Sequence, residues 1–211
     1  MAVIEYFYAA HSGYAYIGSK LLSEVAAAAG ARIDHRPFDW HAVLAANGPN
    51  PTNGLTPQRR AYFSGREIER WAEARGLEII TGRMPTYHDN DYGFANCMLI
   101  ASSLEGADTD ALANRLLEAH WRDDADLADA ATLSRLGNEA GVDVARLLAA
   151  ATSAEVQAIY RSNTAEAIER SVFGSPTYFV DGDMFYGQDH LELVARALEK
   201  PFSGTWPRPA A

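Results

Sequence analysis

Residues 174–187, GSPTYFVDGDMFYG, contain two short segments rich in β-branched and aromatic residues on either side of an Asp-Gly pair. Asp-Gly in this setting indicates a two-residue hairpin turn, so the sequence predicts strands at 177–180 and 184–186. Pro176 stands immediately before the first strand. A cis Ser175–Pro176 bond would turn the backbone N–H and C=O of Ser175 toward a ligand, whereas trans proline at a strand start is the commoner arrangement.

The N-terminal end of the chain predicts a strand, a helix and a second strand. Val3–Tyr8 is apolar except for Glu5 and is typical of a buried strand. Apolar residues then recur at helical spacing from Tyr16 up to Gly30, which suits a helix C-terminus. Residues 32–38 alternate as in a strand, so the chain opens as β-α-β, the beginning of a parallel sheet.

The middle of the chain is interpreted as helical. Residues 40–52 are loop-like, and one helical pattern follows another from about 57 to 169. After the hairpin, a helix is expected over 188–198. This order predicts an α/β fold of the thioredoxin-like kind with an inserted all-helical domain. The expected domains are 1–45 plus 170–211 for the thioredoxin-like part and 46–169 for the insert.

Composition excludes several classes of function. The 211 residues carry a formal charge of −10, which repels nucleic acid. Cys97 is the only cysteine, so intramolecular disulfides and dithiol redox chemistry are excluded. No apolar stretch is long enough for a membrane span, and no signal-peptide pattern opens the chain, so a cytoplasmic protein without membrane contact is expected.

The reactive corner of a thioredoxin-like fold lies between the first strand and the first helix, where backbone N–H groups and the helix dipole stabilise a thiolate. Ser12 occupies this position. It is an ordinary N-cap or a hydroxyl that donates to a sulfur anion brought by a ligand, and the two roles can coexist only if the hydroxyl is free to donate. His11 beside it is either a proton relay or a polar loop histidine.

Two stretches resemble the 2-hydroxychromene-2-carboxylate isomerases, relatives of kappa-class glutathione transferases and DsbA-like oxidoreductases. Residues 171–189 are similar to the family's C-terminal pattern. Residues 4–16, in which an aromatic strand leads into Ser12, are similar to its N-terminal pattern. The resemblance implies glutathione as cofactor, an isomerase reaction by reversible thiolate addition to an unsaturated aromatic keto acid, and a possible homodimer. Phe202 and Trp206 are candidates for dimer contacts.

The resemblance also implies roles for individual residues. Ser12 would contact the glutathione sulfur, Ser175 would pair with the cysteinyl backbone, and Pro176 would be the cis-proline. Gln188 and Asp189 would hold the γ-glutamyl end, which agrees with their position at a helix start. The remaining cofactor-binding positions implied by similarity to the kappa class are Asn50 and Arg59. Without the resemblance, Asn50 is interpreted as a turn residue and Arg59 as a solvated charge on a helix. Asp189 is then interpreted as an acidic residue that complements the dipole at a helix start.

Some positions depart from the family pattern. Gly13 replaces a proline, and residues 82–90 replace the family's run before the long helix. The second-substrate pocket is therefore expected to differ. A kappa-like transferase that conjugates an electrophile stays open as an alternative, as does a non-catalytic DsbA-like peptide-binding module.

Other chemistry-bearing residues have ordinary interpretations. His88 is expected in a solvated loop, not at a metal site. Cys97 lies in an apolar helical run and is expected to be buried and inert. The tyrosines considered for an aromatic wall are Tyr14, Tyr87 and Tyr92.

Overall fold

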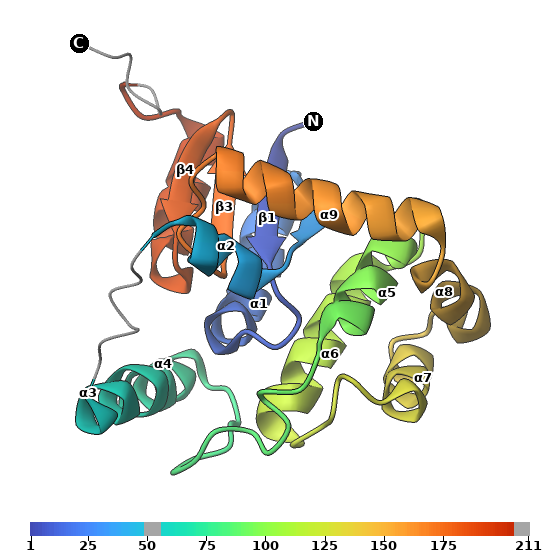
Figure 1. The fold of residues 1–211 in the computed structure, drawn as a ribbon. Coiled ribbons are helices and arrows are strands. Elements are labelled where there is room, and N and C mark those ends of the chain that lie inside the picture. The colour runs from blue at the N-terminus through green and yellow to red at the C-terminus, as the bar shows by residue number, and fades with distance from the viewer. Residues whose placement is uncertain (49–55, 205–211) are drawn as a thin grey trace.

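The computed structural model of the chain describes residues 1–48 and 56–204. Its centre is a four-stranded sheet in the order β2-β1-β3-β4. The strands are β1 (Val3–Tyr8), β2 (Arg32–Pro37), β3 (Thr177–Val180) and β4 (Asp183–Tyr186). β1 runs parallel to β2 and antiparallel to β3, and β3 and β4 form the hairpin (Figure 1). Asp181 and Gly182 at its turn both have positive φ, as a type I′ turn requires. The α/β, thioredoxin-like fold is confirmed.

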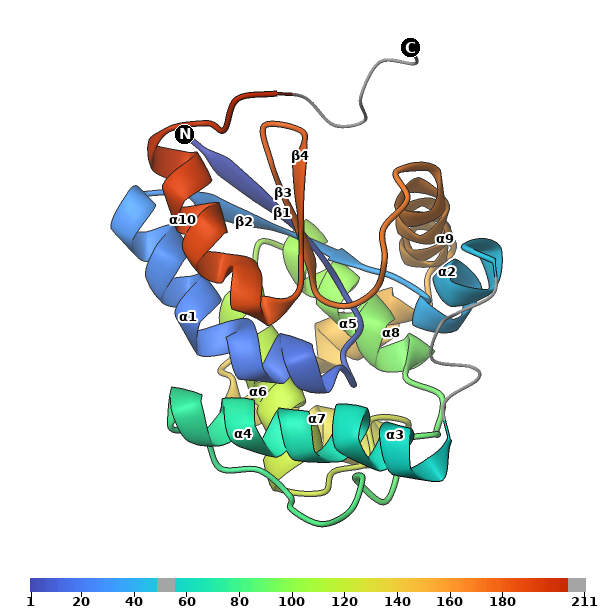
Figure 2. The same cartoon turned by 90° about the vertical axis from the view of Figure 1, so that its left-hand side faces the viewer.

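Helices cover both faces of the sheet. The two ends of the chain form α1 (Gly13–Ala29), α2 (Trp40–Ala46) and α10 (Leu191–Glu199), the last preceded by a 3-10 turn (Gln188–His190). The middle of the chain forms α3 (Pro57–Ala61), a π-helical turn (Tyr62–Arg66), α4 (Glu67–Arg75), α5 (Gly93–Leu104), α6 (Thr109–Arg122), α7 (Ala130–Glu139), α8 (Val144–Ala151) and α9 (Ala154–Glu169). Figure 2 shows α1 and α10 side by side on one face, with α2 and α9 on the other.

Alternation along β1 divides the core between these two faces. Tyr6 and Tyr8 belong to the larger cluster, which includes α1, α5 and α6. Phe7 points the other way, into a smaller cluster with Phe38 and Phe179 under α2 and α9. Glu5, the one charge of the strand, shares that side and is paired with Arg170 at 2.6 Å.

Residues 40–46 correct one expectation, because they form α2 and not a loop. Asp39 caps this seven-residue helix by accepting from the Ala42 N–H at 3.1 Å. Val43 is its one buried side chain, so the segment carries too little apolar periodicity to indicate a helix. The predicted boundary between residues 1–45 plus 170–211 and residues 46–169 stays a prediction.

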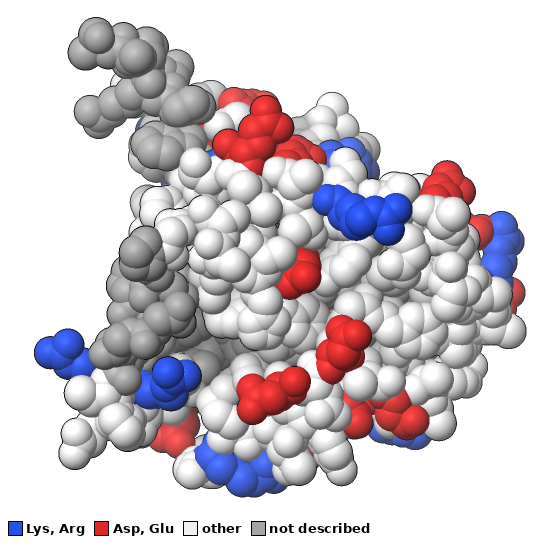
Figure 3. All heavy atoms as spheres, in the orientation of Figure 1, with Lys and Arg blue, Asp and Glu red and all other residues white. Residues whose placement is uncertain are grey.

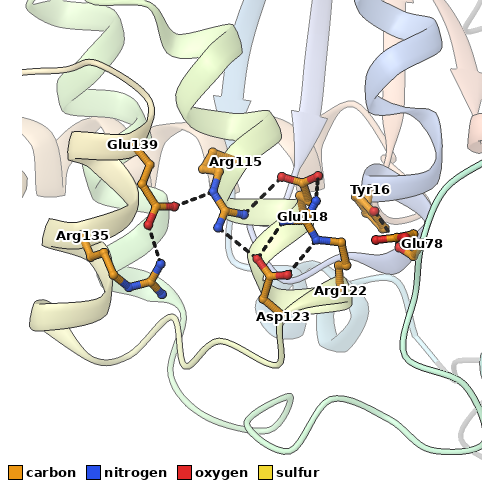
Figure 4. A network of polar contacts seen from close by, with 8 residues as sticks. All are labelled: Tyr16, Glu78, Arg115, Glu118, Arg122, Asp123, Arg135 and Glu139. Carbon is orange, nitrogen blue, oxygen red and sulfur yellow. Dashed lines mark hydrogen bonds and ion pairs between the residues drawn. The ribbon is translucent and has the colours of Figure 1, made fainter.

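An ionic network joins the C-terminal half of α6 to α7 (Figure 4). Arg115 lies at its centre and pairs with Glu118 at 3.2 Å, Asp123 at 2.9 Å and Glu139 at 2.8 Å. Its side chain is only 18% exposed, so these pairs are screened less than ordinary surface pairs. The network therefore helps to fix the last turn of α6, where Trp121 Nε1 donates to the His11 carbonyl at 2.8 Å, beside Ser12.

Charged side chains of both signs are interspersed over the face seen in Figure 3. Within residues 1–48 and 56–204, no helix combines the length and the apolar character needed to cross a membrane.

Candidate active site

Ser12 lies where β1 passes into α1, and its hydroxyl makes two contacts. The oxygen accepts from the Ala15 N–H at 3.2 Å, so Ser12 is the N-cap of α1. The hydroxyl hydrogen is donated to the backbone carbonyl of Ser175, 3.1 Å away. The N-cap expectation is confirmed. Because the cap uses only the oxygen's acceptor capacity, the hydroxyl keeps its ability to donate.

The Ser175–Pro176 peptide bond is cis, as predicted. The Ser175 hydroxyl accepts from the Ala9 N–H at 3.1 Å, which ties this loop to the end of β1. On the far side, the Pro176 carbonyl accepts from the Gly187 N–H at 3.0 Å. No described residue accepts from the Ser175 N–H, so this donor stays available beside the Ser12 hydroxyl.

A cavity of about 330 Å³ opens at this loop. Four of the eight predicted site residues line it, namely Ser175, Pro176, Gln188 and Asp189. The other lining residues come from the start of α1, the α3–α4 region and the β4–α10 connection: Tyr14, Phe63, Glu67, Trp71, Tyr186, Gly187 and His190. The volume falls at the small end of the roughly 300–1,000 Å³ range of small-molecule sites.

Gln188 and Asp189 present different groups to the cavity. The Gln188 side chain is buried, and its oxygen accepts from Arg75 Nε at 3.4 Å and Nη2 at 3.3 Å. Arg75 thereby orients the amide, a positioning role that the sequence analysis missed. The Asp189 side chain is 52% exposed and its carboxylate has no strong ion pair among the described residues. It is available to a cationic group of a ligand.

The other two predicted cofactor residues are not brought to the cavity. Asn50 lies outside the described residues. Arg59 is exposed on α3 and is absent from the described lining. Instead, Phe63, Glu67 and Trp71 line the wall, each four positions after the one before. That spacing was visible in the sequence as one face of a helix, but which face meets a ligand depends on packing.

His11 is buried directly beside Ser12. Its ring stacks on Tyr92 with centroids 3.7 Å apart and lies 5.0 Å from the ring of His88. Burial, followed by the neighbouring histidines, holds the pKa of His11 well below its ordinary value. The imidazole is therefore neutral at pH 7. Whether His11 takes part in proton transfer stays a prediction.

His88 corrects a second expectation. It is partly buried against His11 and Trp121, and its Nδ1 lies 3.1 Å from Nε2 of His120. Burial lowers its pKa to about 4. The interpretation as a solvated loop histidine is wrong because His120 and Trp121, 32 and 33 residues further along the chain, fold back onto it. In the described part of the chain, no three His, Cys, Asp or Glu side chains are arranged to hold a metal ion.

The cysteine, the tyrosines and the tail residues considered in the sequence analysis lie in different surroundings. Cys97 is buried as predicted, and burial raises the pKa of its thiol to about 11. Tyr14 lines the cavity and donates to the Phe63 carbonyl at 2.9 Å, whereas Tyr87 is exposed. In the C-terminal tail, Phe202 is exposed, and its ring centroid lies 6.1 Å from that of Phe185. Trp206 lies outside the described residues.

The chain is similar to known proteins over nearly its whole length. The chain is 26% identical to a 2-hydroxychromene-2-carboxylate isomerase of Sphingobium xenophagum over 198 residues, which cover 92% of this chain and 97% of that protein. It is also 26% identical to a protein of the same name from Pseudomonas putida over 200 residues, covering 93% and 94%. A solved structure of 2-hydroxychromene-2-carboxylate isomerase superposes with a TM-score of 0.78 at 23% identity, covering 94% of this chain and 95% of that one.

The family comparison covers nearly the whole chain. Residues 3–199, from the start of β1 to the end of α10, match the DSBA-like thioredoxin domain. This range includes the Ser12 corner, the Ser175–Pro176 loop and the helices between them. The chain is therefore a member of the family of DSBA-like thioredoxin domains.

Proposed function

We propose that this protein is a glutathione-dependent isomerase of the 2-hydroxychromene-2-carboxylate isomerase type that acts on an unsaturated aromatic keto acid. The observation that carries the proposal is the position of the Ser12 hydroxyl, at the N-terminus of α1 and 3.1 Å from the Ser175 carbonyl in the wall of the cavity. The names of the relatives support the reaction class.

The residues around the cavity suit the tripeptide. The Ser175 N–H and C=O form a donor and acceptor pair of the kind that binds an extended peptide backbone. Asp189 offers a carboxylate to the α-ammonium group, and the buried Gln188 amide, held by Arg75, offers a neutral polar contact nearby. Binding at the Ser175 carbonyl would compete with the Ser12 hydroxyl and release it to donate to the sulfur.

Glutathione, when bound, supplies a thiolate whose reversible addition to a conjugated double bond allows rotation about that bond. The task of the protein is to keep the sulfur anionic at neutral pH. Lowering a thiol pKa from about 9 to about 7 requires roughly 2.7 kcal/mol at 1.36 kcal/mol per unit. A charge-assisted hydrogen bond from Ser12 is worth roughly 1.5–3 kcal/mol, and the dipole of α1 adds roughly 0.3–2 kcal/mol. These two contributions suffice.

Calorimetry and product analysis test the proposal in two steps. We expect saturable heat of glutathione binding, followed by isomerisation of aromatic unsaturated α-keto acids with full recovery of free glutathione. Consumption of glutathione with formation of a conjugate would instead identify a kappa-like transferase. An absence of saturable glutathione binding would contradict both readings and leave the DsbA-like peptide-binding module. The single buried cysteine gives no support to dithiol oxidoreductase chemistry.

A further inference from the structure

The peptide unit that joins His11 to Ser12 is held at both of its ends. Its N–H, which belongs to Ser12, is donated to the Ala9 carbonyl at 3.0 Å within the turn that follows β1. Its C=O, which belongs to His11, accepts from Trp121 Nε1 at 2.8 Å. A peptide unit is planar, so bonds at opposite ends fix its orientation. The Cα atom of Ser12 is attached directly to this plane, and the indole therefore limits where the Ser12 hydroxyl can point.

Trp121 is itself firmly held. It lies in the last turn of α6 and is only 2% exposed. The ring of His88 meets the indole edge to face, with centroids 5.4 Å apart. The next two residues, Arg122 and Asp123, pair with each other at 2.7 Å in the ionic network of Figure 4. A buried indole N–H needs an acceptor, and the His11 carbonyl supplies it, so Trp121 is a well-fixed donor.

Gly13 provides a second sign of the same contact. It is the first residue of α1, a position where proline is favoured and where glycine brings no helix-forming advantage. A Cβ atom at position 13 would lie 2.6 Å from Cζ2 of Trp121, well inside the roughly 3.5–4.0 Å of a carbon–carbon contact. The indole ring thus packs on the backbone of Gly13 while its N–H holds His11. These are the two residues on either side of Ser12.

Trp121 acts on the site without lining it. The described lining of the cavity includes Ser175 and Asp189 but not Trp121. The Ser12 hydroxyl is donated to the Ser175 carbonyl at 3.1 Å, so its direction connects the corner to the cavity wall. A hydrogen bond weakens steeply as its donor turns away from the acceptor. A small rotation of the peptide plane before Ser12 therefore weakens the donor to the sulfur and removes no group that binds the tripeptide.

We propose that Trp121 is a positioning residue for Ser12. Its indole N–H and its ring fix the backbone on both sides of the serine and so direct the hydroxyl at the sulfur of the bound thiol. The proposal rests on the proposed function for the identity of that thiol. No bond is formed or broken at Trp121, and its effect is on the ionisation of the sulfur and not on the affinity for the tripeptide.

Trp121→Phe keeps an aromatic ring and removes the N–H. We expect the pKa of the bound glutathione thiol to rise from about 7 to about 8, so the ionised fraction at pH 7 falls from about one half to about one tenth. The kcat at pH 7 should then fall about fivefold and recover near pH 9, while the KM for glutathione stays within about twofold of the wild type. A loss of packing alone would lower kcat equally at both pH values.

Tyr16→Phe is the matched control. Tyr16 is also a buried aromatic residue, and its hydroxyl donates to a backbone carbonyl at the same distance, 2.8 Å. That carbonyl belongs to Glu78, which is not bonded to Ser12. The variant should be less stable than the wild type but should keep the wild-type thiol pKa and the wild-type pH dependence of kcat.

The variant Ser12→Cys gives a second readout that needs no glutathione. The introduced thiol lies at the N-terminus of α1, which lowers its pKa, and the buried Cys97 thiol, with a pKa of about 11, titrates separately. In this background Trp121→Phe should raise the pKa of the introduced thiol, measured from thiolate absorbance, and Tyr16→Phe should leave it unchanged. Gly13→Ala, which forces the indole aside, should raise it too. Combined with Trp121→Phe, its effect should be less than additive.

A bound-thiol pKa in Trp121→Phe equal to that of the wild type would overturn the proposal, as would a loss of kcat that persists near pH 9. If glutathione does not bind saturably, the proposed function fails, and the thiol introduced by Ser12→Cys then decides alone. A rise of its pKa in Trp121→Phe supports positioning by the indole, and an unchanged pKa contradicts it. If Trp121→Phe does not fold, Gly13→Ala provides the same comparison with the indole present.

Discussion

Replacing Ser12 by alanine should separate its two roles, as cap of α1 and as donor to a sulfur anion. The Ser12 oxygen accepts from the Ala15 N–H at 3.2 Å, and its hydrogen is donated to the Ser175 carbonyl at 3.1 Å. Ser12→Ala removes both contacts at once. The chain provides a matched reference in Ser153, which caps α9 by accepting from the Val156 N–H, also at 3.2 Å.

The expected magnitudes differ for the two properties. Loss of a serine N-cap costs about 1 kcal/mol, which for a chain of this size lowers Tm by about 2–4 °C. This cost should be similar in Ser12→Ala and Ser153→Ala. Loss of a charge-assisted hydrogen bond to sulfur costs roughly 1.5–3 kcal/mol of thiolate stabilisation, so kcat/KM at pH 7 should fall about 10- to 150-fold, and only in Ser12→Ala.

The assay pairs thermal unfolding with steady-state turnover of the keto acid at saturating glutathione. Ser153→Ala should unfold earlier than the wild type by the amount expected for a lost cap and keep its rate. An undiminished kcat/KM in Ser12→Ala would refute the assignment of Ser12 as the sulfur donor. Equal losses of activity in the two variants would show that capping alone explains the effect.

Three further outcomes follow from the same contacts. Arg75→Met should release the Gln188 amide and raise the KM for glutathione several-fold with little change in kcat, measured by steady-state kinetics. Arg115→Met should lower the free energy of unfolding by about 1–2 kcal/mol without changing kcat, measured by urea denaturation, because three carboxylates lose their shared partner. Burial lowers the pKa values of His11 and His88 in the folded protein, that of His88 to about 4. Between pH 6.5 and 5, both histidines therefore bind protons in the unfolded state but not in the folded state. The free energy of unfolding should therefore decrease as the pH is lowered, by about 1.4 kcal/mol per pH unit for each histidine. His11→Phe should reduce this slope between pH 6.5 and 5. An unaltered slope would contradict the assignment of His11 as a buried, neutral imidazole.

Local chemistry made the hairpin and the cap predictable. Asp181 and Gly182 tolerate the positive φ values that the turn requires, 49° and 84°, and this preference belongs to the residues themselves. Ser12 could be placed as a cap for the same reason. By contrast, α2 is short and has Val43 as its one buried residue, so the neighbouring Asn47 and Gly48 suggested a loop.

The site was only partly predictable, because its members meet through packing. Ser12 and Ser175 are 163 residues apart and were paired through a resemblance, not through spacing. The contact between Arg75 and Gln188 spans 113 residues and left no local sign in either segment. His88 belongs to a polar loop, and only the fold places it between His11 and His120. Sequence patterns record periodicity and turn chemistry, but they do not record which distant surfaces face each other.

The ionisation of the bound glutathione thiol tests the central claim most directly. Ultraviolet difference titration of the thiolate absorbance, with the protein saturated by the tripeptide, measures this pKa without any keto acid. We expect a thiol pKa of about 7 in the wild type, a rise toward 9 in Ser12→Ala, and the wild-type value in Ser153→Ala. A bound thiol that titrates near 9 in the wild type would contradict the claim that Ser12 and the N-terminus of α1 hold the sulfur as an anion.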